Sequence, residues 1–233
     1  FATFKSTHVI NFAAETHVDR SIHGGAADFV RTNIMGVQTI LEAVKKYGVE
    51  RMVHVSTDEV YGSLSISTKK KFIESNQFLP NSPYAASKAG GDLLCRAYHE
   101  TWGVPVIVTH STNNFGAYQY PEKLIPFFIL RLLEGKKVPL YGDGKNVRDW
   151  LYVDDHCEAL SLIMEKGVPG ERYNIGSNNE KSNFQIAKML LGYFNKSEDQ
   201  IEYVTDRPGH DRRYALDVSK IGKELGWKPR FSF

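Results

Sequence analysis

Two short stretches carry the residue types that acid–base chemistry needs. The first is Thr57-Asp58-Glu59, a hydroxyl followed by two adjacent carboxyls. The second is Tyr84-Ala85-Ala86-Ser87-Lys88, in which a phenol and an ammonium stand four residues apart and therefore share one face of a helix. A lysine held near a tyrosine is expected to stabilise the phenolate, to lower its pKa from about 10 and so to make Tyr84 a base near neutrality.

The acid pair suits an elimination of water next to a ketone. One carboxylate can remove the proton alpha to the carbonyl while its protonated neighbour gives a proton to the departing hydroxyl. Environments that push the two pKa values apart permit this division. The alternatives are a helix cap followed by solvated acids at Asp58 and Glu59, and a chance Tyr-x-x-x-Lys spacing in an ordinary helix.

The elements that must position these residues alternate between strand and helix. Buried strands are predicted at residues 7–14, 51–56 and 104–109, with helices over 26–47 and 84–102 between them. Strands joined in this way form a parallel sheet with right-handed crossovers. In such sheets ligands bind at the carboxyl ends of the strands, where the acid pair would lie.

The pattern becomes mixed after Asn114. Helices are predicted over 121–133 and 182–194, and a third, capped by Asp154-Asp155, running to Lys166. Short strands are predicted at 138–141, 147–153 and 172–175, with Gly142-Asp143-Gly144 as a hairpin turn. We therefore expect an α/β fold with a Rossmann-type parallel sheet and a smaller mixed lobe.

Composition excludes several classes of partner. The 233 residues are 42% hydrophobic and 24% charged with a net charge of +2, which argues against nucleic acid or an anionic membrane as the main partner. Only Cys95 and Cys157 are present, and the eight histidines have no metal-ligand spacing, so we expect reduced thiols and no metal. No leader or membrane-spanning run is found, and a cytoplasmic protein is expected.

One common feature of dinucleotide enzymes is missing. None of the 19 glycines has the spacing of the glycine-rich turn that binds a pyrophosphate through backbone amides. Either the N-terminal part of the sheet domain precedes Phe1, or the protein is not a dinucleotide enzyme.

Several motifs, taken in order, resemble the nucleotide-sugar 4,6-dehydratases of the extended short-chain dehydrogenase/reductase family. The resemblance covers essentially the whole chain. His110 stands where that family more often has arginine, and Ala117 where it usually has proline. The stretches that carry it are 11–21, 56–62, 84–88, 113–116, 120–126, 148–153, 173–176 and 207–214.

The resemblance implies an internal redox cycle on tightly held NAD. Tyr84 would take the proton of the sugar 4-hydroxyl, oriented by Thr57, while C4 gives hydride to NAD. Glu59 would then remove the C5 proton and Asp58 would protonate the leaving C6 hydroxyl, after which the hydride returns to C6. The product is a 4-keto-6-deoxy sugar; dTDP-glucose is the favoured substrate, and a uridine nucleotide is left open.

The resemblance also implies which residues contact the two ligands. Near NAD it places Phe12, Ala13, Ala14, Glu15, Thr16, Thr32, Tyr84, Lys88 and Asn114. Near the nucleotide sugar it places Thr16, Thr57, Asn113, Lys123, Leu124, Pro139, Leu140, Tyr141, Arg148, Asn174, Asp211, Arg212, Arg213 and Tyr214. Residues 1–116 with 148–167 would form the NAD-binding domain, and 117–147 with 168–233 the sugar-nucleotide-binding lobe. A homodimer through the helices at 26–47 and 84–102 is expected.

Two other functions fit part of this pattern. A sugar-nucleotide 4-epimerase or a UDP-glucuronate decarboxylase would share the tyrosine, the lysine and the fold, but neither needs the Asp58-Glu59 pair. A non-enzymatic binding module, or an inactive fragment without the NAD phosphate loop, is the second class. Such a fragment is expected to purify without NAD.

Overall fold

The computed structural model describes residues 1–233, and its largest sheet has four parallel strands in the order β1-β2-β3-β7. Their bounds are β1 (His8–Asn11), β2 (Arg51–Thr57), β3 (Val106–Ser111) and β7 (Arg172–Ile175). All six residues of β3 are buried, as a central parallel strand requires. The predicted parallel α/β sheet is confirmed.

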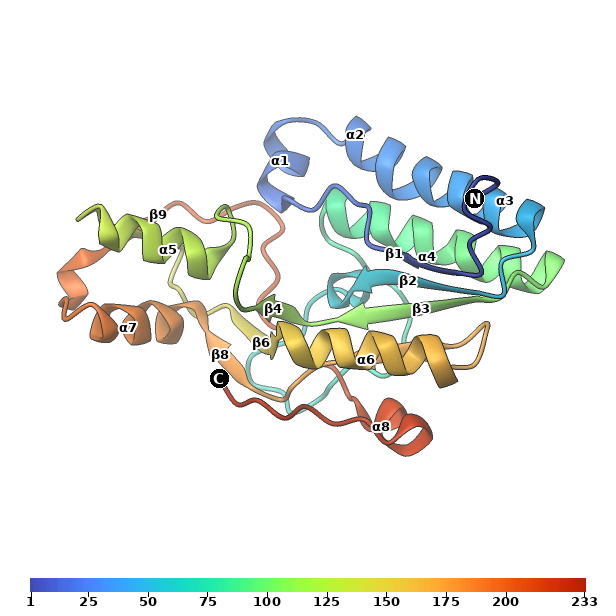
Figure 1. Ribbon diagram of the computed structural model, residues 1–233. Helices are drawn as coiled ribbons and strands as arrows, with labels where there is room; N and C mark the ends of the chain where they lie inside the picture. The colour runs from blue at the N-terminus through green and yellow to red at the C-terminus, as the bar shows by residue number, and fades with distance from the viewer.

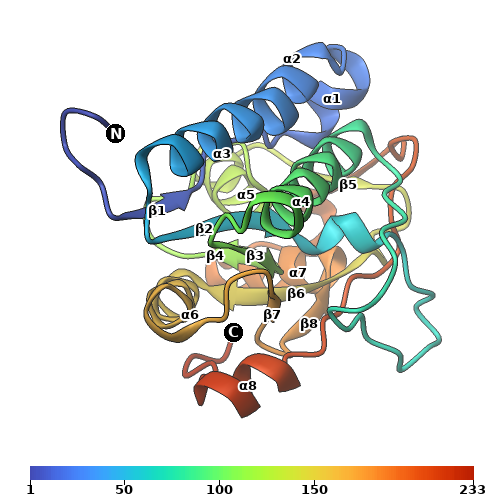
Figure 2. The ribbon, with the colours of Figure 1, turned by 90° about the vertical axis from the view of Figure 1, so that its right-hand side faces the viewer.

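Helices cover both faces of this sheet (Figures 1 and 2). Successive strand residues point to opposite faces, so Met52 packs toward Leu41 and Cys95 while Val53 packs toward Ile163. On one side lie α1 (Val18–His23), α2 (Ala27–Val30), the π-helical segment η1 (Arg31–Met35), α3 (Gly36–Tyr47) and α4 (Pro83–Trp102). On the other lie α6 (Val153–Lys166) and α8 (Ser219–Leu225).

A second core forms at the far end of the molecule. Strand β5 (Val138–Tyr141) pairs in parallel with β9 (Ile201–Val204), and Phe128, Leu140 and Leu191 are buried between these strands and the helices. The helical segments there are α5 (Leu124–Leu133), α7 (Asn183–Tyr193) and η3 (Glu198–Gln200). A third sheet, between the two cores in Figure 1, contains β4 (Asn113–Phe115), β6 (Val147–Tyr152) and β8 (Glu180–Ser182).

Helix α4 starts and ends where its sequence directs. The Ser82 hydroxyl accepts the Ala85 N–H at 3.1 Å, and Pro83 occupies the first turn, where no N–H is needed. Gly91 lets α4 approach η1, because a Cβ there would lie 2.6 Å from the Asn33 carbonyl oxygen. The helix ends at Gly103, which is left-handed with φ 66°.

Two predictions about local structure are wrong. Gly142 to Gly144 form a turn but not a hairpin, because β5 pairs with β9 while β6 pairs with β4 and β8. Asp154 and Asp155 do not cap α6: Tyr152 is its N-cap residue, and no side-chain cap bond is made. The Asp155 carboxylate instead accepts the backbone N–H groups of Arg230 and Phe231, both at 3.0 Å.

The division into two domains stays a prediction, and the topology refines its boundaries. Strand β7 belongs to the main sheet, and Ile221 of α8 packs in the same core as Ile163 and Tyr173. Both elements fall within residues 168–233, which were assigned to the smaller lobe. That lobe is therefore built around β5, β9, α5 and α7.

Three further features bear on the expectations from composition. Cys95 is a buried free thiol, and Cys157 is an exposed one. No group of three or more His, Cys, Asp and Glu side chains is arranged to hold a metal ion. None of the helices combines the length and the apolar character needed to cross a membrane.

Asp155 should contribute strongly to stability, since its side chain is fully buried and holds the C-terminal segment by two N–H groups. We expect Asp155→Ala to lower the free energy of unfolding by about 2 to 3 kcal/mol, because hydrogen bonds to a charged group are lost. Urea denaturation measures this. Asp154→Ala, at an exposed neighbour, is the control and should cost less than about 1 kcal/mol; equal losses in the two variants would refute the assignment.

Candidate active site

The acid pair lies at the carboxyl end of β2, as predicted. Thr57 is the last residue of β2, opposite Ser111 in the parallel register with β3, and Asp58 begins the 3-10 helix η2 (Asp58–Tyr61). The Thr57 hydroxyl caps this helix by accepting the Glu59 N–H at 3.3 Å. After this cap, Asp58 is buried and Glu59 lines a cavity.

Asp58 occupies a water-poor site. Its residue is 2% exposed, and Oδ2 has no hydrogen-bond partner. Burial raises the pKa of Asp58 well above its usual range, and the charge of Glu59 raises it further, while Arg148 acts in the opposite direction. Asp58 is therefore favoured as a protonated acid.

Glu59 faces cations as well as apolar atoms. Burial raises its pKa, but Arg148 and Arg207 oppose this shift, and Lys123 does so more weakly. Its carboxyl lines the cavity described below and accepts the Tyr214 hydroxyl at 3.4 Å. The pKa of Glu59 is raised overall, but less far than that of Asp58, so the protonated form is favoured more strongly at Asp58 than at Glu59.

The expected effect of Lys88 on Tyr84 is not found. Burial raises the pKa of Tyr84 well above its ordinary value, Glu59 raises it further, and a hydrogen bond with Thr57 offsets only part of the shift. Lys88 is also buried, and its ammonium donates to the Val55 carbonyl oxygen at 2.7 Å. The lysine is engaged with β2, and the nearest strong charges to the phenol are carboxylates.

A cavity of about 430 Å³ opens beside Glu59. It lies between the start of α1, the smaller lobe and β6, and it gathers residues from distant parts of the chain. The predicted substrate residues that line it are Thr16, Asn113, Lys123, Leu124, Pro139, Leu140, Tyr141 and Arg148. Thr57, Asp58 and Tyr84 are buried next to Glu59 and do not line it.

Asn174 and Arg213, also predicted to contact substrate, lie elsewhere. The Asn174 amide is buried, accepts the Tyr61 hydroxyl at 3.0 Å and donates to the Phe72 carbonyl oxygen at 3.0 Å, so it is occupied within the core. Arg213 is paired through two nitrogens with Glu180, at 2.6 and 2.8 Å. These side chains hold the fold together.

The remaining three predicted contacts, Asp211, Arg212 and Tyr214, do not line the cavity either. Arg212 pairs with Asp143 near the surface, at 2.9 and 3.0 Å. Tyr214 and Asp211 support a residue that does line the cavity. The Arg148 guanidinium stacks 4.2 Å from the centre of the Tyr214 ring and donates to the Asp211 carbonyl oxygen.

Sequence reasoning missed six polar residues that line the cavity. Asn183, Arg207, His210 and Glu122 come from the smaller lobe, and His17 and Asp19 from the start of α1. His210 is neutral near pH 7, since burial and then the charge of Arg207 lower its pKa to about 4. The Arg207-to-His210 run was noticed only as a motif. Which of its side chains enter the cavity depends on the pairing of β9 with β5, which no local pattern shows.

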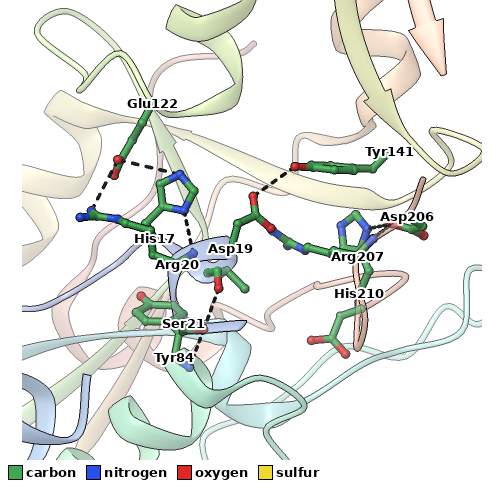
Figure 3. Close-up of polar contacts among 12 residues, drawn as sticks. His17, Asp19, Arg20, Ser21, Tyr84, Glu122, Tyr141, Asp206, Arg207 and His210 are labelled. Carbon is green, nitrogen blue, oxygen red and sulfur yellow. Dashed lines mark hydrogen bonds and ion pairs between the residues drawn. The ribbon is translucent and has the colours of Figure 1, made fainter. Parts of the chain in front are cut away.

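Figure 3 shows how the start of the chain contacts the smaller lobe at the edge of the cavity. The Asp19 carboxylate accepts the Tyr141 hydroxyl at 3.3 Å and pairs with Arg207 at 3.4 Å. On the other side of α1, the Glu122 carboxylate lies 3.5 Å from Arg20 and 3.9 Å from His17.

The residues expected near the nicotinamide end of NAD have free hydrogen-bonding atoms that could bind it. Lys88 uses one of its N–H groups on Val55 and has others to donate, and the buried Asn114 Oδ1 has no hydrogen-bond partner. Phe12, in the expected cofactor loop, is 59% exposed. Asn33 fixes that loop to α4, because it exchanges hydrogen bonds with the Glu15 backbone and donates to Ser87 at 2.8 Å.

The fold and site together define a nucleotide-sugar enzyme of the short-chain dehydrogenase/reductase class. The family described as GDP-mannose 4,6 dehydratase matches residues 1–233, and the chain belongs to this family. It is 50% identical over 243 residues to the dTDP-glucose 4,6-dehydratase of Xanthomonas campestris, a match that includes 97% of this chain and 68% of that protein. The enzyme of the same name from Haemophilus influenzae is 48% identical, a match that includes 100% of this chain and 74% of that protein.

Solved structures agree with this assignment. The dTDP-glucose 4,6-dehydratase of Streptomyces venezuelae, with NAD and dTDP bound, superposes with a TM-score of 0.94 at 50% identity, covering 97% of this chain and 69% of that one. The UDP-glucuronic acid 4-epimerase of Bacillus cereus superposes with a TM-score of 0.91 at 30% sequence identity. This match covers 97% of this chain and 71% of that one. The Rossmann-type fold and the family resemblance are confirmed, and the chain spans about seven tenths of these proteins.

The burial of Asp58 predicts a pH-dependent gain of stability on Asp58→Asn. The folded pKa is raised above the unfolded value of about 3.9, so wild-type stability falls as pH rises through this interval. The amide cannot ionise, and its advantage over wild type should be larger at pH 8 than at pH 4. Urea denaturation across this range measures it, with Asp154→Asn as the exposed control; an advantage for Asp58→Asn that does not change with pH would contradict the raised pKa.

Proposed function

We propose that the protein dehydrates a nucleoside-diphosphate glucose, dTDP-glucose by preference, to the 4-keto-6-deoxy sugar, acting as an NAD-dependent lyase. The observation that carries the proposal is the adjacent acid pair, in which Asp58 is buried without a partner for Oδ2 and Glu59 lies near Arg148 and Arg207. The relatives that are about 50% identical carry the same activity in their names.

The chain's own residues divide the proton transfers among them. Tyr84 accepts the proton of the sugar 4-hydroxyl, and Thr57, which lowers the pKa of Tyr84, orients that hydroxyl. Glu59 then removes the proton at C5, which the ketone at C4 makes acidic, and gives a proton back to C5 once C6 has received hydride. Asp58 holds the proton that the departing 6-hydroxyl requires.

NAD, when bound, supplies the hydride acceptor at C4 and returns the hydride to C6. Lys88 has ammonium protons left to bind the nicotinamide ribose, and Asn114 offers a buried amide oxygen. The exposed loop from Phe12 to Thr16 and Thr32 form the rest of the proposed contact surface. A cation close to the phenol would oppose the effect of Glu59 and bring the pKa of Tyr84 down.

The cavity offers cations where a diphosphate would lie. Arg148 and Arg207 both line it, and a guanidinium matches phosphate oxygens through parallel N–H groups. Burial lowers the pKa of Lys123, which also lines the cavity and donates to Thr16. We assign the diphosphate to this group and the sugar to the end near Glu59.

The epimerase alternative shares the fold with this chain, as the Bacillus cereus enzyme illustrates. Epimerisation at C4 needs a base and a hydride carrier, but no acid that protonates a leaving hydroxyl. A buried, protonated Asp58 would have no task in that reaction. The acid pair therefore favours dehydration.

Substitutions at the acid pair should separate oxidation from elimination. With the polypeptide of the complete reading frame, Asp58→Asn and Glu59→Gln should each lower kcat by about 100-fold or more, since one proton transfer is removed. Both should still form reduced nicotinamide, whereas Tyr84→Phe should not. Absorbance of the keto sugar in alkali and of reduced nicotinamide measures these steps.

Asp143→Asn, which breaks only the surface pair with Arg212, is the control and should keep the wild-type rate. Wild-type formation of keto sugar by Asp58→Asn together with Glu59→Gln would eliminate the proposed mechanism. An epimerised product from the wild-type protein would favour the alternative.

We also infer a homodimer, and a cytoplasmic location stays a prediction. Apolar side chains are exposed along two neighbouring helices: Met35 is 58% exposed beside α3, and Leu93 and Trp102 of α4 are 57% and 54% exposed. We expect Leu93→Glu to shift the protein to monomers in analytical ultracentrifugation. Tyr193→Glu, at an 82% exposed residue of the smaller lobe, should leave the dimer intact; a dimer that survives Leu93→Glu would move the interface elsewhere.

A further inference from the structure

Helix α1 makes polar contacts with both halves of the active site. It lies at the edge of the cavity, and none of its residues has a place in the proton transfers described above. Three of its side chains nevertheless contact residues that do, or residues that line the cavity (Figure 3). Ser21 contacts α4, whereas Asp19 contacts the smaller lobe.

Ser21 contacts the helix that carries the proposed base. Its hydroxyl accepts the Tyr84 N–H at 3.3 Å and donates to the Val18 carbonyl oxygen at 2.7 Å, and Ser21 is 2% exposed. The Tyr84 N–H lies in the first turn of α4, where no earlier helical carbonyl can accept it. The capping hydroxyl of Ser82 is already used by Ala85, so Ser21 provides the partner for this N–H.

Asp19 contacts the smaller lobe. Its carboxylate accepts the Tyr141 hydroxyl and pairs with Arg207, and both side chains line the cavity. The side chains of Arg207 and Asp19 are 18% and 26% exposed, so water screens this pair less than it would a surface pair. Arg207 is also one of the cations that favour the ionised form of Glu59.

The geometry of the helix makes these contacts a mechanical link. Residues two apart on a helix point about 200° apart, so Asp19 faces the lobe while Ser21 faces α4. The short helix is fixed at both ends: the His17 ring accepts the Arg20 N–H, and the Gly24 N–H is bonded to the Arg20 carbonyl. Through Asp19 and Ser21, the same short helix therefore connects Arg207 to the first turn of α4.

We propose that Asp19 and Ser21 are positioning residues through which α1 couples nucleotide binding in the cavity to the orientation of Tyr84. The inference rests on the proposed function, because it assigns the cavity to the nucleotide sugar. A diphosphate held by Arg207 fixes the position of the guanidinium between the phosphate and Asp19, and α1, fixed in turn by Asp19, holds the Tyr84 backbone through Ser21 in the position in which the phenol meets the sugar.

Kinetics of the polypeptide of the complete reading frame test the role of Ser21. Ser21→Ala should lower kcat and the single-turnover rate of nicotinamide reduction by about tenfold, the effect of one lost hydrogen bond, and leave KM for dTDP-glucose unchanged. Ser21→Thr keeps the hydroxyl and should recover most of the rate. Ser161→Ala, at an exposed serine of α6, is the matched control. A wild-type rate for Ser21→Ala, or a rise in KM that accounts for the whole effect, would overturn the proposal.

Asp19→Asn tests the other end of the link. It should raise KM and lower kcat, and the double variant Asp19→Asn, Ser21→Ala should have the kcat of Ser21→Ala alone, because both changes break the same chain of contacts. Asp28→Asn, which changes an exposed carboxylate of α2, is the control. Additive losses in the double variant would show two independent roles and refute the coupling.

Amide exchange gives a result that does not depend on turnover. In the wild-type protein, dTDP should slow hydrogen exchange at the Tyr84 amide, followed by NMR. In Asp19→Asn and Ser21→Ala, dTDP at saturation should leave that exchange rate unchanged. If dTDP slows Tyr84 exchange equally in Asp19→Asn, the link is absent. If the wild type couples in this way but forms no 4-keto-6-deoxy sugar, the proposed function fails while the inference stands.

Discussion

The parallel register of β2 is the constraint on which the site depends. Because β2 lies between β1 and β3 with both faces covered, its last residue, Thr57, delivers the following acids into a place with little water. The neighbouring residues of η2, Val60 and Tyr61, are at most 1% exposed and anchor the turn. Burying a carboxyl is unfavourable by itself, and this packing offsets the cost of keeping Asp58 there. The raised pKa is the direct result, and it is the property that an acid catalyst needs.

Helix α4 carries Tyr84, the proposed base, at the same edge of the sheet. Its position is fixed by close approach to η1, which Gly91 permits, and by the Ser82 cap at its start. Asp92, one turn beyond Lys88, accepts hydrogen bonds from Ser56 at 2.8 Å and from His110 at 3.1 Å, which joins α4 to β2 and β3. His110, which stands where the resembling family more often has arginine, thus supplies a donor at this point. Histidine in place of arginine at this position therefore still connects α4 to the sheet.

Local patterns predicted most of the sheet domain. Apolar runs gave β1, β2, β3 and β7 their positions to within a few residues, and the Tyr84-to-Lys88 spacing placed both residues on α4. Hydrogen bonding between distant strands could not be predicted in this way. The turn at Gly142 to Gly144 looks locally like a hairpin, but β5 finds its partner in β9, about sixty residues later. The predicted lowering of the Tyr84 pKa was not found for a related reason: the spacing to Lys88 says nothing of the burial of the phenol, which raises its pKa most, or of the nearby Glu59 carboxylate in η2, which raises it further.

The same limit explains which cavity residues were found. The family resemblance named Lys123, Tyr141 and Arg148, which line the cavity, but it did not name Arg207 and His210, which come from a loop that the parallel pairing of β9 with β5 carries there. Asn174 and Arg213 stay predicted substrate contacts, but both side chains have partners within the fold, as polar residues of a shared motif often do. Burial decides between these roles: an amide whose donor and acceptor atoms are used in the core has nothing left to bind a ligand, whereas Arg207 keeps its guanidinium at the cavity wall. The Oδ2 of Asp58 is the reverse case, a buried polar atom without a partner, and this is consistent with its proposed role toward the substrate.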